Sequence, residues 1–367
     1  MENENKYLLL TPGPLTTSST VKRAMEFDYC TWDEDYKGIT QTIRRSLLDI
    51  AQVSSEKYTS VLMQGSGTYG VESVISSVIP DDGVLMIAMN GAYGERIGQM
   101  ADVYGIDHVD LIIDEQQPIT LESVKQMLNR YPAITHFAMI HCETTTGILN
   151  PIEDIIPWVH EQGIITIVDA MSSFGGIPIA VGDLKIDYLI SSTNKCIQGV
   201  PGFSFIIANK EKLKETADIA RTLSLDLFSQ YDEMEANHGK WRFTSPTHVV
   251  HAFAQALIEL RVEGGVEKRF ERYQDNQTRL SEGMKKLGFK PLIDLEWQSP
   301  IITSFKYPND DFDFKNFYDK LKESGFVIYP GKLSELPTFR IGNIGEVYSE
   351  DITRLLKVIE GLSQKIS

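Results

Sequence analysis

The sequence predicts an α/β protein with a large domain built on a mostly parallel, seven-stranded sheet and a smaller α+β domain at the C-terminal end. In the first half of the chain, apolar runs typical of strands alternate with amphipathic helical patterns. This alternation is typical of a parallel sheet wrapped by helices. A chain of 367 residues is also long enough for two domains, since a domain usually contains about 100–200 residues.

Seven segments have the apolar character expected of strands in the larger sheet. They are Tyr58–Gln64, Val84–Met89, His108–Ile113, Ile134–His141, Ile164–Asp169, Asp187–Ser192 and Phe203–Ala208. The last segment follows its predecessor through a Pro-Gly turn that is too short for a parallel crossover. We therefore expect this strand to run antiparallel to the one before it.

Helical patterns occupy several of the intervals between these strands. An apolar face repeats at i, i+3, i+4 and i+7 in Val71, Val74, Ile75 and Val78. Thr120 has the position of an N-cap for a helix with Leu121, Val124 and Leu128 on one face. A short helix is expected to end near Glu161, with Pro157 in its first turn, where a missing N–H costs little.

The remainder of the chain predicts the smaller domain. A long helical stretch, His248–Lys268, leads out of the sheet region, and the pattern then reads as a helix, strands and a final helix. The expected elements are a helix over Asn276–Leu287, a strand over Ile301–Tyr307 and a helix over Phe314–Gly325. We place the boundary at Gly264-Gly265, so that residues 21–264 form the large domain and residues 265–367 the small one.

Composition limits the classes of partner. The formal charge is −16, from 51 acidic and 35 basic residues, which argues against nucleic acid and anionic membranes. Three cysteines are too few for a disulfide framework and lack zinc spacing, so we expect no metal and a reducing compartment. No signal-peptide pattern opens the chain and no apolar run could span a bilayer. These features predict a cytoplasmic protein.

Ligands of open α/β sheets bind outside the carboxyl ends of the strands. One segment there, Gly65-Ser66-Gly67-Thr68, joins a strand to a helix. Free N–H groups at a helix N-terminus bind phosphate, and glycine lets the backbone approach closely. The segment lacks the spacing and the lysine of a P-loop. On its own it is equally typical of a tight turn with an N-cap.

Two ionisable residues end later strands. Asp169 ends an apolar strand, where a carboxylate is costly unless it is paired, and it could pair with a protonated ring nitrogen. Lys195 lies just past the next strand, and a partly desolvated amine can form a Schiff base. A lone Asp could instead be an N-cap and a lone Lys a surface residue. The combination of a phosphate cup, an Asp and a Lys at one sheet edge predicts pyridoxal 5′-phosphate (PLP).

Other candidates are weaker individually. Tyr93 could stack on a cofactor ring or be a buried helix-start residue. Arg340 could bind a carboxylate or phosphonate, or lie at the surface. Thr244 lies in a rigid turn ahead of a proline. Cys196 is adjacent to Lys195 and therefore faces elsewhere, and His141 reads as a core or edge residue rather than a base.

Together these motifs resemble the class V aminotransferases, a branch of the fold-type I PLP enzymes. The resemblance spans nearly the whole chain and includes Thr11-Pro-Gly-Pro14, Asn90–Arg96, His141–Gly147, Asp169–Gly176, Ser192–Gly202, Trp241–Thr247 and Arg340–Gly345. The segments Cys30–Asp33, His141–Gly147 and Ser192–Gly199 are similar to the subfamily that transfers the amine of 2-aminoethylphosphonate to pyruvate. Related enzymes that use alanine and glyoxylate have tryptophan where this chain has Tyr93.

The resemblance implies a role for each matching residue. Lys195 forms the Schiff base; Asp169 pairs with the pyridine nitrogen; Ser66, Gly67 and Thr68 hold the phosphate; Tyr93 stacks on the ring; Thr144 donates near its phenolic oxygen; Thr244 reaches the phosphate of a neighbouring subunit; and Arg340 binds the acidic end of the substrate. It also implies a homodimer with shared active sites, and places residues 1–20 at the active site and the small domain.

Three alternative functions stay open. Another class V aminotransferase, acting on alanine or serine with glyoxylate or pyruvate, is the nearest. A cysteine desulfurase would need a nucleophilic cysteine late in the chain, and none follows Cys196. A non-catalytic PLP-binding regulator would need a basic recognition helix or a lost lysine, whereas Lys195 is present.

Overall fold

The computed structural model describes residues 6–331 and 336–363. Within them, the large sheet has seven strands in the order β2-β10-β9-β8-β5-β3-β4. The bounds are β2 Tyr58–Gln64, β3 Val84–Met89, β4 Asp107–Ile112, β5 His136–Ile140, β8 Ile165–Asp169, β9 Tyr188–Ser192 and β10 Phe203–Asn209. The strand β10 is antiparallel to both β9 and β2, while the other pairs are parallel. The predicted mostly parallel α/β fold is confirmed.

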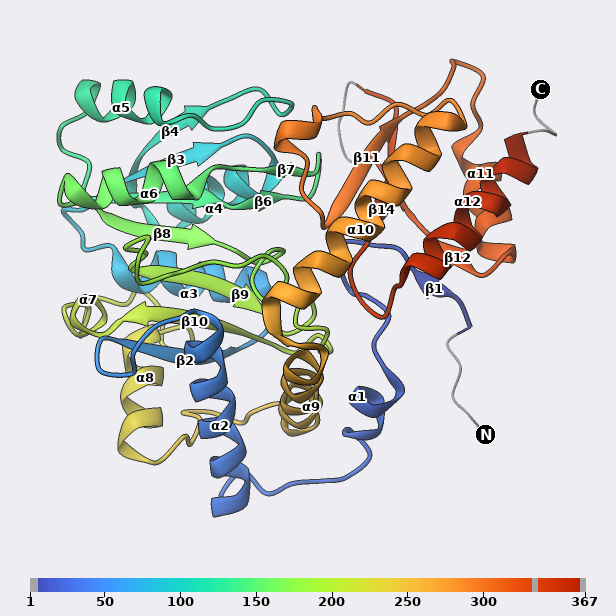
Figure 1. The fold of residues 1–367 in the computed structure, drawn as a ribbon. Coiled ribbons are helices and arrows are strands. Elements are labelled where there is room, and N and C mark those ends of the chain that lie inside the picture. Colours follow the sequence, from blue (N-terminus) through green and yellow to red (C-terminus); the bar gives the residue numbers. More distant parts are fainter. Residues whose placement is uncertain (1–5, 332–335, 364–367) are drawn as a thin grey trace.

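Helices cover both faces of this sheet (Figure 1). Along β5, Phe137 and Met139 belong to one core cluster, while Ala138 and Ile140 belong to the other. This alternation follows from the period of two in a strand that is buried on both sides. The helices are α2 Glu34–Ile50, α3 Gly67–Val78, α4 Ala92–Tyr104, α5 Leu121–Arg130, α6 Ile152–Glu161, α7 Lys210–Lys214, α8 Leu227–Ala236 and α9 Thr247–Glu263.

Two helical expectations need correction. The continuous helix expected over His248–Lys268 is broken, because α9 ends at Glu263 and α10 (Gly265–Lys286) begins after Gly264. Gly264 has φ = 109°, a left-handed conformation that glycine adopts at little cost. Pro157 lies inside α6 rather than in its first turn, since the buried apolar face of that helix already begins at Ile152.

The C-terminal part forms a second layered unit around α10. Its antiparallel sheet has the order β11-β14-β13, with β11 Ile302–Lys306, β14 Thr338–Gly342 and β13 Tyr329–Pro330. A separate apolar core joins β11 and β14 to α10, α11 (Phe314–Glu323) and α12 (Ser349–Ser363). The division at residues 264 and 265 coincides with the helix break, but as a domain boundary it stays a prediction.

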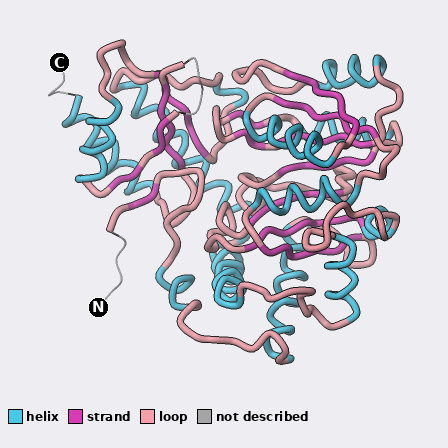
Figure 2. The backbone as a smooth tube through the Cα atoms, turned by 180° about the vertical axis from the view of Figure 1, so that it is seen from behind, coloured by secondary structure: helices cyan, strands magenta, loops and turns pink. Residues whose placement is uncertain are grey.

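The N-terminal segment crosses to this C-terminal unit, as both views of the backbone show (Figures 1 and 2). The strand β1 (Leu8–Leu9) pairs in parallel with β12 (Phe326–Val327). The chain then passes through the short helix α1 (Ser19–Arg23) before it enters the large sheet region. No helix in the described part of the chain is both long and apolar enough to cross a bilayer.

Candidate active site

A cavity of about 220 Å³ lies at the carboxyl ends of the parallel strands. Segments that follow five different strands meet there, as expected from the shared edge of a parallel sheet. Its lining residues are Ser66, Gly67, Thr68, Val71, Tyr93, Arg96, Ile140, Cys142, Asp169, Met171, Ser172, Ser192, Asn194 and Lys195. Among the described residues, no cluster of three or more His, Cys, Asp or Glu side chains could hold a metal ion.

The predicted phosphate cup forms one wall of the cavity. Ser66 is the N-cap of α3, but its side chain makes no capping hydrogen bond to that helix. Gly67 packs so closely that a Cβ atom would lie 2.3 Å from the sulfur of Met171. A side chain at position 67 would fit only if Met171 moved, and the first-turn N–H groups of α3 remain close to the cavity.

Asp169 is the last residue of β8 and is 7% exposed. Its Oδ1 accepts a hydrogen bond of 2.8 Å from the backbone N–H of Met171. Burial raises the pKa of Asp169 to about 6, although the positive charges of Lys195 and Arg96 act in the opposite direction. A cationic group in the cavity would stabilise the charged carboxylate and bring this pKa down.

Lys195 lies in the turn after β9, and its Nζ donates a hydrogen bond of 2.7 Å to the carbonyl oxygen of Pro12. Burial lowers the pKa of Lys195 to about 8, against the opposing charge of Asp169. A Cβ atom on Gly13 would lie 2.8 Å from both Nζ and Cδ of this lysine. The segment Thr11–Pro14 therefore lies directly against the amine.

A buried carboxylate that the sequence analysis missed organises the opposite side of the site. Glu143 accepts hydrogen bonds from the N–H of Tyr93 (3.2 Å) and from the N–H and hydroxyl of Thr145 (3.1 and 2.7 Å). Burial raises the pKa of Glu143 to about 7. A Cβ atom on Gly91 would approach its carboxyl carbon to 2.5 Å. Glu143 thus links the loop after β3 to the loop after β5.

Tyr93 and Thr144 are brought together by this arrangement. The hydroxyl of Thr144 donates to the phenol oxygen of Tyr93 at 3.4 Å. The guanidinium of Arg96, another residue that the sequence analysis gave no role, lies 5.2 Å from the ring centroid of Tyr93. Its spacing of three residues from Tyr93, on one face of α4, is the signal that could have identified it.

Arg340 is connected to the site but does not line the cavity. It lies on β14, is 6% exposed, and donates to the carbonyl oxygens of Pro330 (3.0 Å) and Thr144 (2.9 Å). Its position therefore depends on the same loop that contacts Tyr93. Thr244 is not brought to the cavity, because it lies exposed in the loop between α8 and α9.

The chemistry of this donor set fits PLP. The cavity combines an amine of lowered pKa, a buried carboxylate that lacks full charge compensation, and a glycine-containing helix N-terminus. These groups suit an aldehyde, a ring nitrogen and a phosphate, respectively.

The chain is similar to known proteins over nearly its whole length. A sequence profile of the family Aminotransferase class-V matches residues 32–348. A protein of Lactiplantibacillus plantarum named 2-aminoethylphosphonate–pyruvate transaminase is 58% identical over 359 residues, which are 98% of each chain. A protein of Bacillus cereus with the same name is 57% identical over 97% of this chain and 98% of its own length.

Solved structures show the same fold at lower identity. Ureidoglycine–glyoxylate aminotransferase from Bacillus subtilis has a TM-score of 0.89 at 23% identity, covering 100% of this chain and 95% of its own. Pyridoxamine–pyruvate aminotransferase from Mesorhizobium loti has a TM-score of 0.90 at 22% identity, covering 100% and 94%. These matches confirm the predicted fold, enzyme class and PLP cofactor, and the chain belongs to the class V aminotransferases.

Proposed function

We propose that the protein transfers the amine of 2-aminoethylphosphonate to pyruvate, giving phosphonoacetaldehyde and L-alanine. The observation that carries this proposal is the identity of 58% over 98% of both chains with a relative of that name. An enzyme that uses alanine or serine as donor with glyoxylate is less well supported. The solved structure of an enzyme named for glyoxylate is only 23% identical to this chain, so the likeness shows the fold alone.

The cofactor chemistry requires four things of the protein. PLP supplies an electron-withdrawing ring that takes up the charge left when a proton leaves the carbon next to the amine. Ser66, Gly67 and Thr68, at the N-terminus of α3, would hold the phosphate. Asp169 favours the protonated ring nitrogen by charge pairing. Tyr93 would stack on the ring, and the hydroxyl of Thr144, which donates to Tyr93 in this structure, would turn toward the phenolic oxygen of the bound cofactor.

Lys195 both attaches the cofactor and moves the proton. A pKa of about 8 leaves a useful fraction of the amine neutral near pH 7, and only the neutral amine can act as nucleophile or base. The hydrogen bond to the Pro12 carbonyl directs the nitrogen toward one place at the cavity wall. This interaction uses one N–H of the amine and leaves its lone pair for the reaction.

Arg340 binds the acidic end of both substrates. Two of its donors are occupied by the Pro330 and Thr144 carbonyls, which fix the plane of the guanidinium. The remaining edge binds either a phosphonate or a carboxylate, since both accept paired hydrogen bonds. One residue can therefore serve both half-reactions of a ping-pong cycle.

A homodimer with shared active sites is part of this proposal. Thr244 is exposed and outside the cavity of its own chain, as expected for a residue that reaches a neighbour's phosphate. Large exposed aromatic side chains occur in the same loop and near the N-terminus: Phe243 (49%), Trp32 (71%) and Phe27 (65%). A second subunit would remove these rings from water. We also propose a cytoplasmic location.

The absorbance of the purified, PLP-loaded protein tests the function. Adding 2-aminoethylphosphonate without an acceptor should convert the lysine-linked cofactor to its amine form, and pyruvate should reverse the change. If only alanine or serine causes the conversion, the substrate assignment is wrong but Lys195 retains its role. If no lysine-linked absorbance forms after PLP is supplied, the assignment of Lys195 is wrong.

A further inference from the structure

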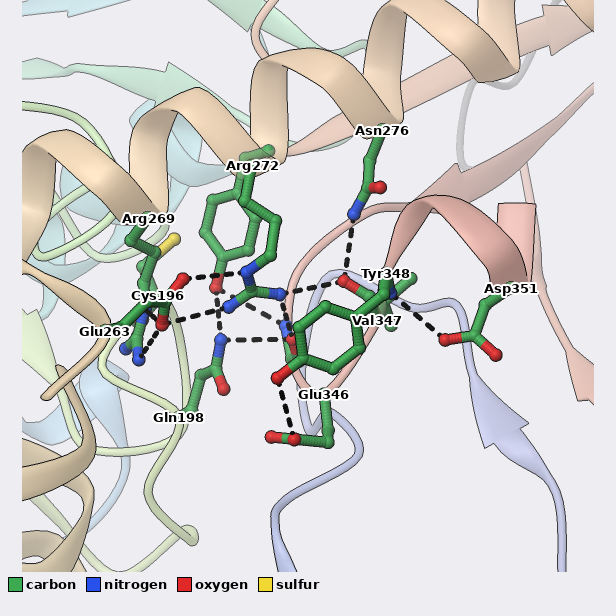
Figure 3. A network of polar contacts seen from close by, with 12 residues as sticks. Cys196, Gln198, Glu263, Arg269, Arg272, Asn276, Glu346, Val347, Tyr348 and Asp351 are labelled. Carbon is green, nitrogen blue, oxygen red and sulfur yellow. Dashed lines mark hydrogen bonds and ion pairs between the residues drawn. The ribbon is translucent and has the colours of Figure 1, made fainter. Parts of the chain in front are cut away.

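The turn that carries Lys195 is tied from outside the cavity to α10 (Figure 3). Arg269, which is 1% exposed, donates a hydrogen bond of 2.8 Å to the carbonyl oxygen of Cys196, the residue after the lysine. Its Nε and Nη2 donate to one oxygen of Glu263, at 2.9 and 2.7 Å. A charged donor therefore holds the peptide next to Lys195 while its own charge is neutralised at the end of α9.

The same carboxylate extends the connection to the C-terminal unit. Arg272 donates to the other oxygen of Glu263 at 2.7 Å, and its Nη1 donates to the carbonyl oxygens of Gly345 (2.9 Å) and Val347 (2.8 Å). Residues 345–347 follow β14, the strand that contains Arg340. Burial acts to raise the pKa of Glu263, but the two guanidinium groups together hold it below its usual value, so the carboxylate is charged.

Gln198 forms a second, direct connection. Its amide nitrogen donates to Gly345 O at 3.0 Å and to the hydroxyl of Tyr273 at 2.8 Å. Its backbone N–H closes the turn by donating to Lys195 O at 2.8 Å. Gln198 has φ = 67°, an unfavourable conformation for a residue with a side chain. A glycine would relieve this strain, so the side-chain contacts are a reason for glutamine here.

We propose that Arg269 and Gln198 are positioning residues for Lys195, and that Glu263 and Arg272 keep the lysine turn in register with the segment that follows Arg340. The role of Lys195 in this inference rests on the proposed function. Proton transfer depends steeply on the position of the amine, and a displacement of about 1 Å can slow a reaction by about a hundredfold. The contacts of Glu263 and Arg272 would also maintain the distance between the Lys195 amine and the guanidinium of Arg340, which binds the substrate.

The variant Gln198→Gly gives the sharpest test. It removes both side-chain hydrogen bonds, but glycine adopts the left-handed backbone conformation without strain. We therefore expect the variant to fold. Asn276→Ala is the matched control, because it removes a buried hydrogen bond of 2.9 Å from α10 to the Val347 carbonyl but leaves the contacts of Arg269 and Gln198 with the lysine turn in place. Arg269→Lys is the second test variant, since a lysine cannot reproduce the forked contact with Cys196 O and Glu263.

PLP-loaded proteins are compared by the rate of the first half-reaction at saturating amine donor, by KM, and by a pH titration of the lysine-linked absorbance. We expect Gln198→Gly and Arg269→Lys to slow the half-reaction by about tenfold or more and to shift the titration, with KM changed by less than about twofold. Asn276→Ala should leave the titration midpoint in place. The inference is overturned if both test variants match the wild type in half-reaction rate, KM and titration midpoint. It is also overturned if Asn276→Ala changes these three quantities as much as the test variants do.

This result is separable from the proposed function. The pH titration needs only the lysine-linked cofactor and no substrate. If wild-type protein forms that species but does not react with 2-aminoethylphosphonate, the substrate assignment fails, and the shift of the titration in the two test variants still decides the inference. If wild-type protein does not form it, the role of Lys195 fails, and the inference fails with it.

Discussion

The amine of Lys195 lies 2.7 Å from the carbonyl oxygen of Pro12, a residue 183 positions earlier in the chain. The neighbouring Gly13 has φ = 114° and has no room for a side chain on the face toward the lysine. The N-terminal segment is therefore a wall of the reactive site. The backbone conformation of Gly13 favours glycine, and a side chain there would fit only if Lys195 moved.

This contact predicts the effect of Gly13→Ala. A methyl group placed 2.8 Å from Nζ would displace the amine, so PLP loading and the half-reaction should slow by about tenfold or more. Gly288→Ala is the control, because Gly288 also has a positive φ (89°) but has no atom within 4 Å of the added methyl group. Loading rates are followed by absorbance. Equal effects of the two variants would show that backbone strain, not proximity to Lys195, is responsible.

Lys195→Met should abolish transamination but stabilise the cofactor-free protein. Because the folded pKa of about 8 is below the usual 10.5, the unfolded chain binds more protons between these values, and stability rises with pH across that window. Below pH 8 the lysine destabilises the fold by on the order of 3 kcal/mol, and methionine removes this cost. Urea unfolding at pH 7 and pH 9 measures the difference. If the difference in free energy of unfolding between the variant and the wild type is as large at pH 9 as at pH 7, this account is wrong.

Asp169→Asn should weaken PLP binding and reduce activity by at least about a hundredfold, because an amide cannot stabilise a protonated ring nitrogen by charge. The cofactor-free variant should be more stable than wild type at pH 7. The folded pKa of about 6 is above the usual 3.8, so the folded state binds more protons between these values and loses stability as pH rises through them. Fluorescence titration with PLP and thermal denaturation without it check the two effects; unchanged PLP affinity would rule out the pairing.

Arg340→Ala should raise the KM for both 2-aminoethylphosphonate and pyruvate by about tenfold or more, as expected for the loss of a charge-assisted anion contact. Steady-state kinetics with each substrate varied in turn measures the change. Arg279→Ala is a suitable control, since Arg279 is exposed on α10 and pairs with Asp275. An effect on neither substrate would remove Arg340 from the binding site.

Much of the large sheet could be predicted from the sequence, because its strands are buried on both faces. The bounds of β2 and β3 match the predicted runs at both ends. The run of β3 is entirely apolar, and in β2 every residue but the last is buried. The helix α2 was not predicted. Its buried face includes Tyr36, Thr40 and Arg44, which interrupt an apolar pattern. Polar residues that are buried in the fold cannot be told from surface residues by periodicity alone.

The candidate site divides in a similar way. Asp169, Lys195 and the residues of the phosphate cup could be placed together because parallel strands bring their carboxyl ends to one edge. The contact of Pro12 with Lys195 could not be predicted from periodicity or spacing, since it depends on where a distant loop returns; only the family resemblance placed residues 1–20 near the site. The same holds for Glu143, whose partners come from its own loop and from the loop after β3.

The pairing of β1 with β12 determines when the active site can be completed during translation. Residues 8 and 9 are translated more than 300 residues before the strand that they join, Phe326–Val327. The large sheet can fold as soon as β10 is available, because domains generally fold in order from the N-terminus. Throughout that interval the segment that covers Lys195 has no partner strand. A nascent chain would therefore hold a nearly finished cofactor cavity with its lysine uncovered.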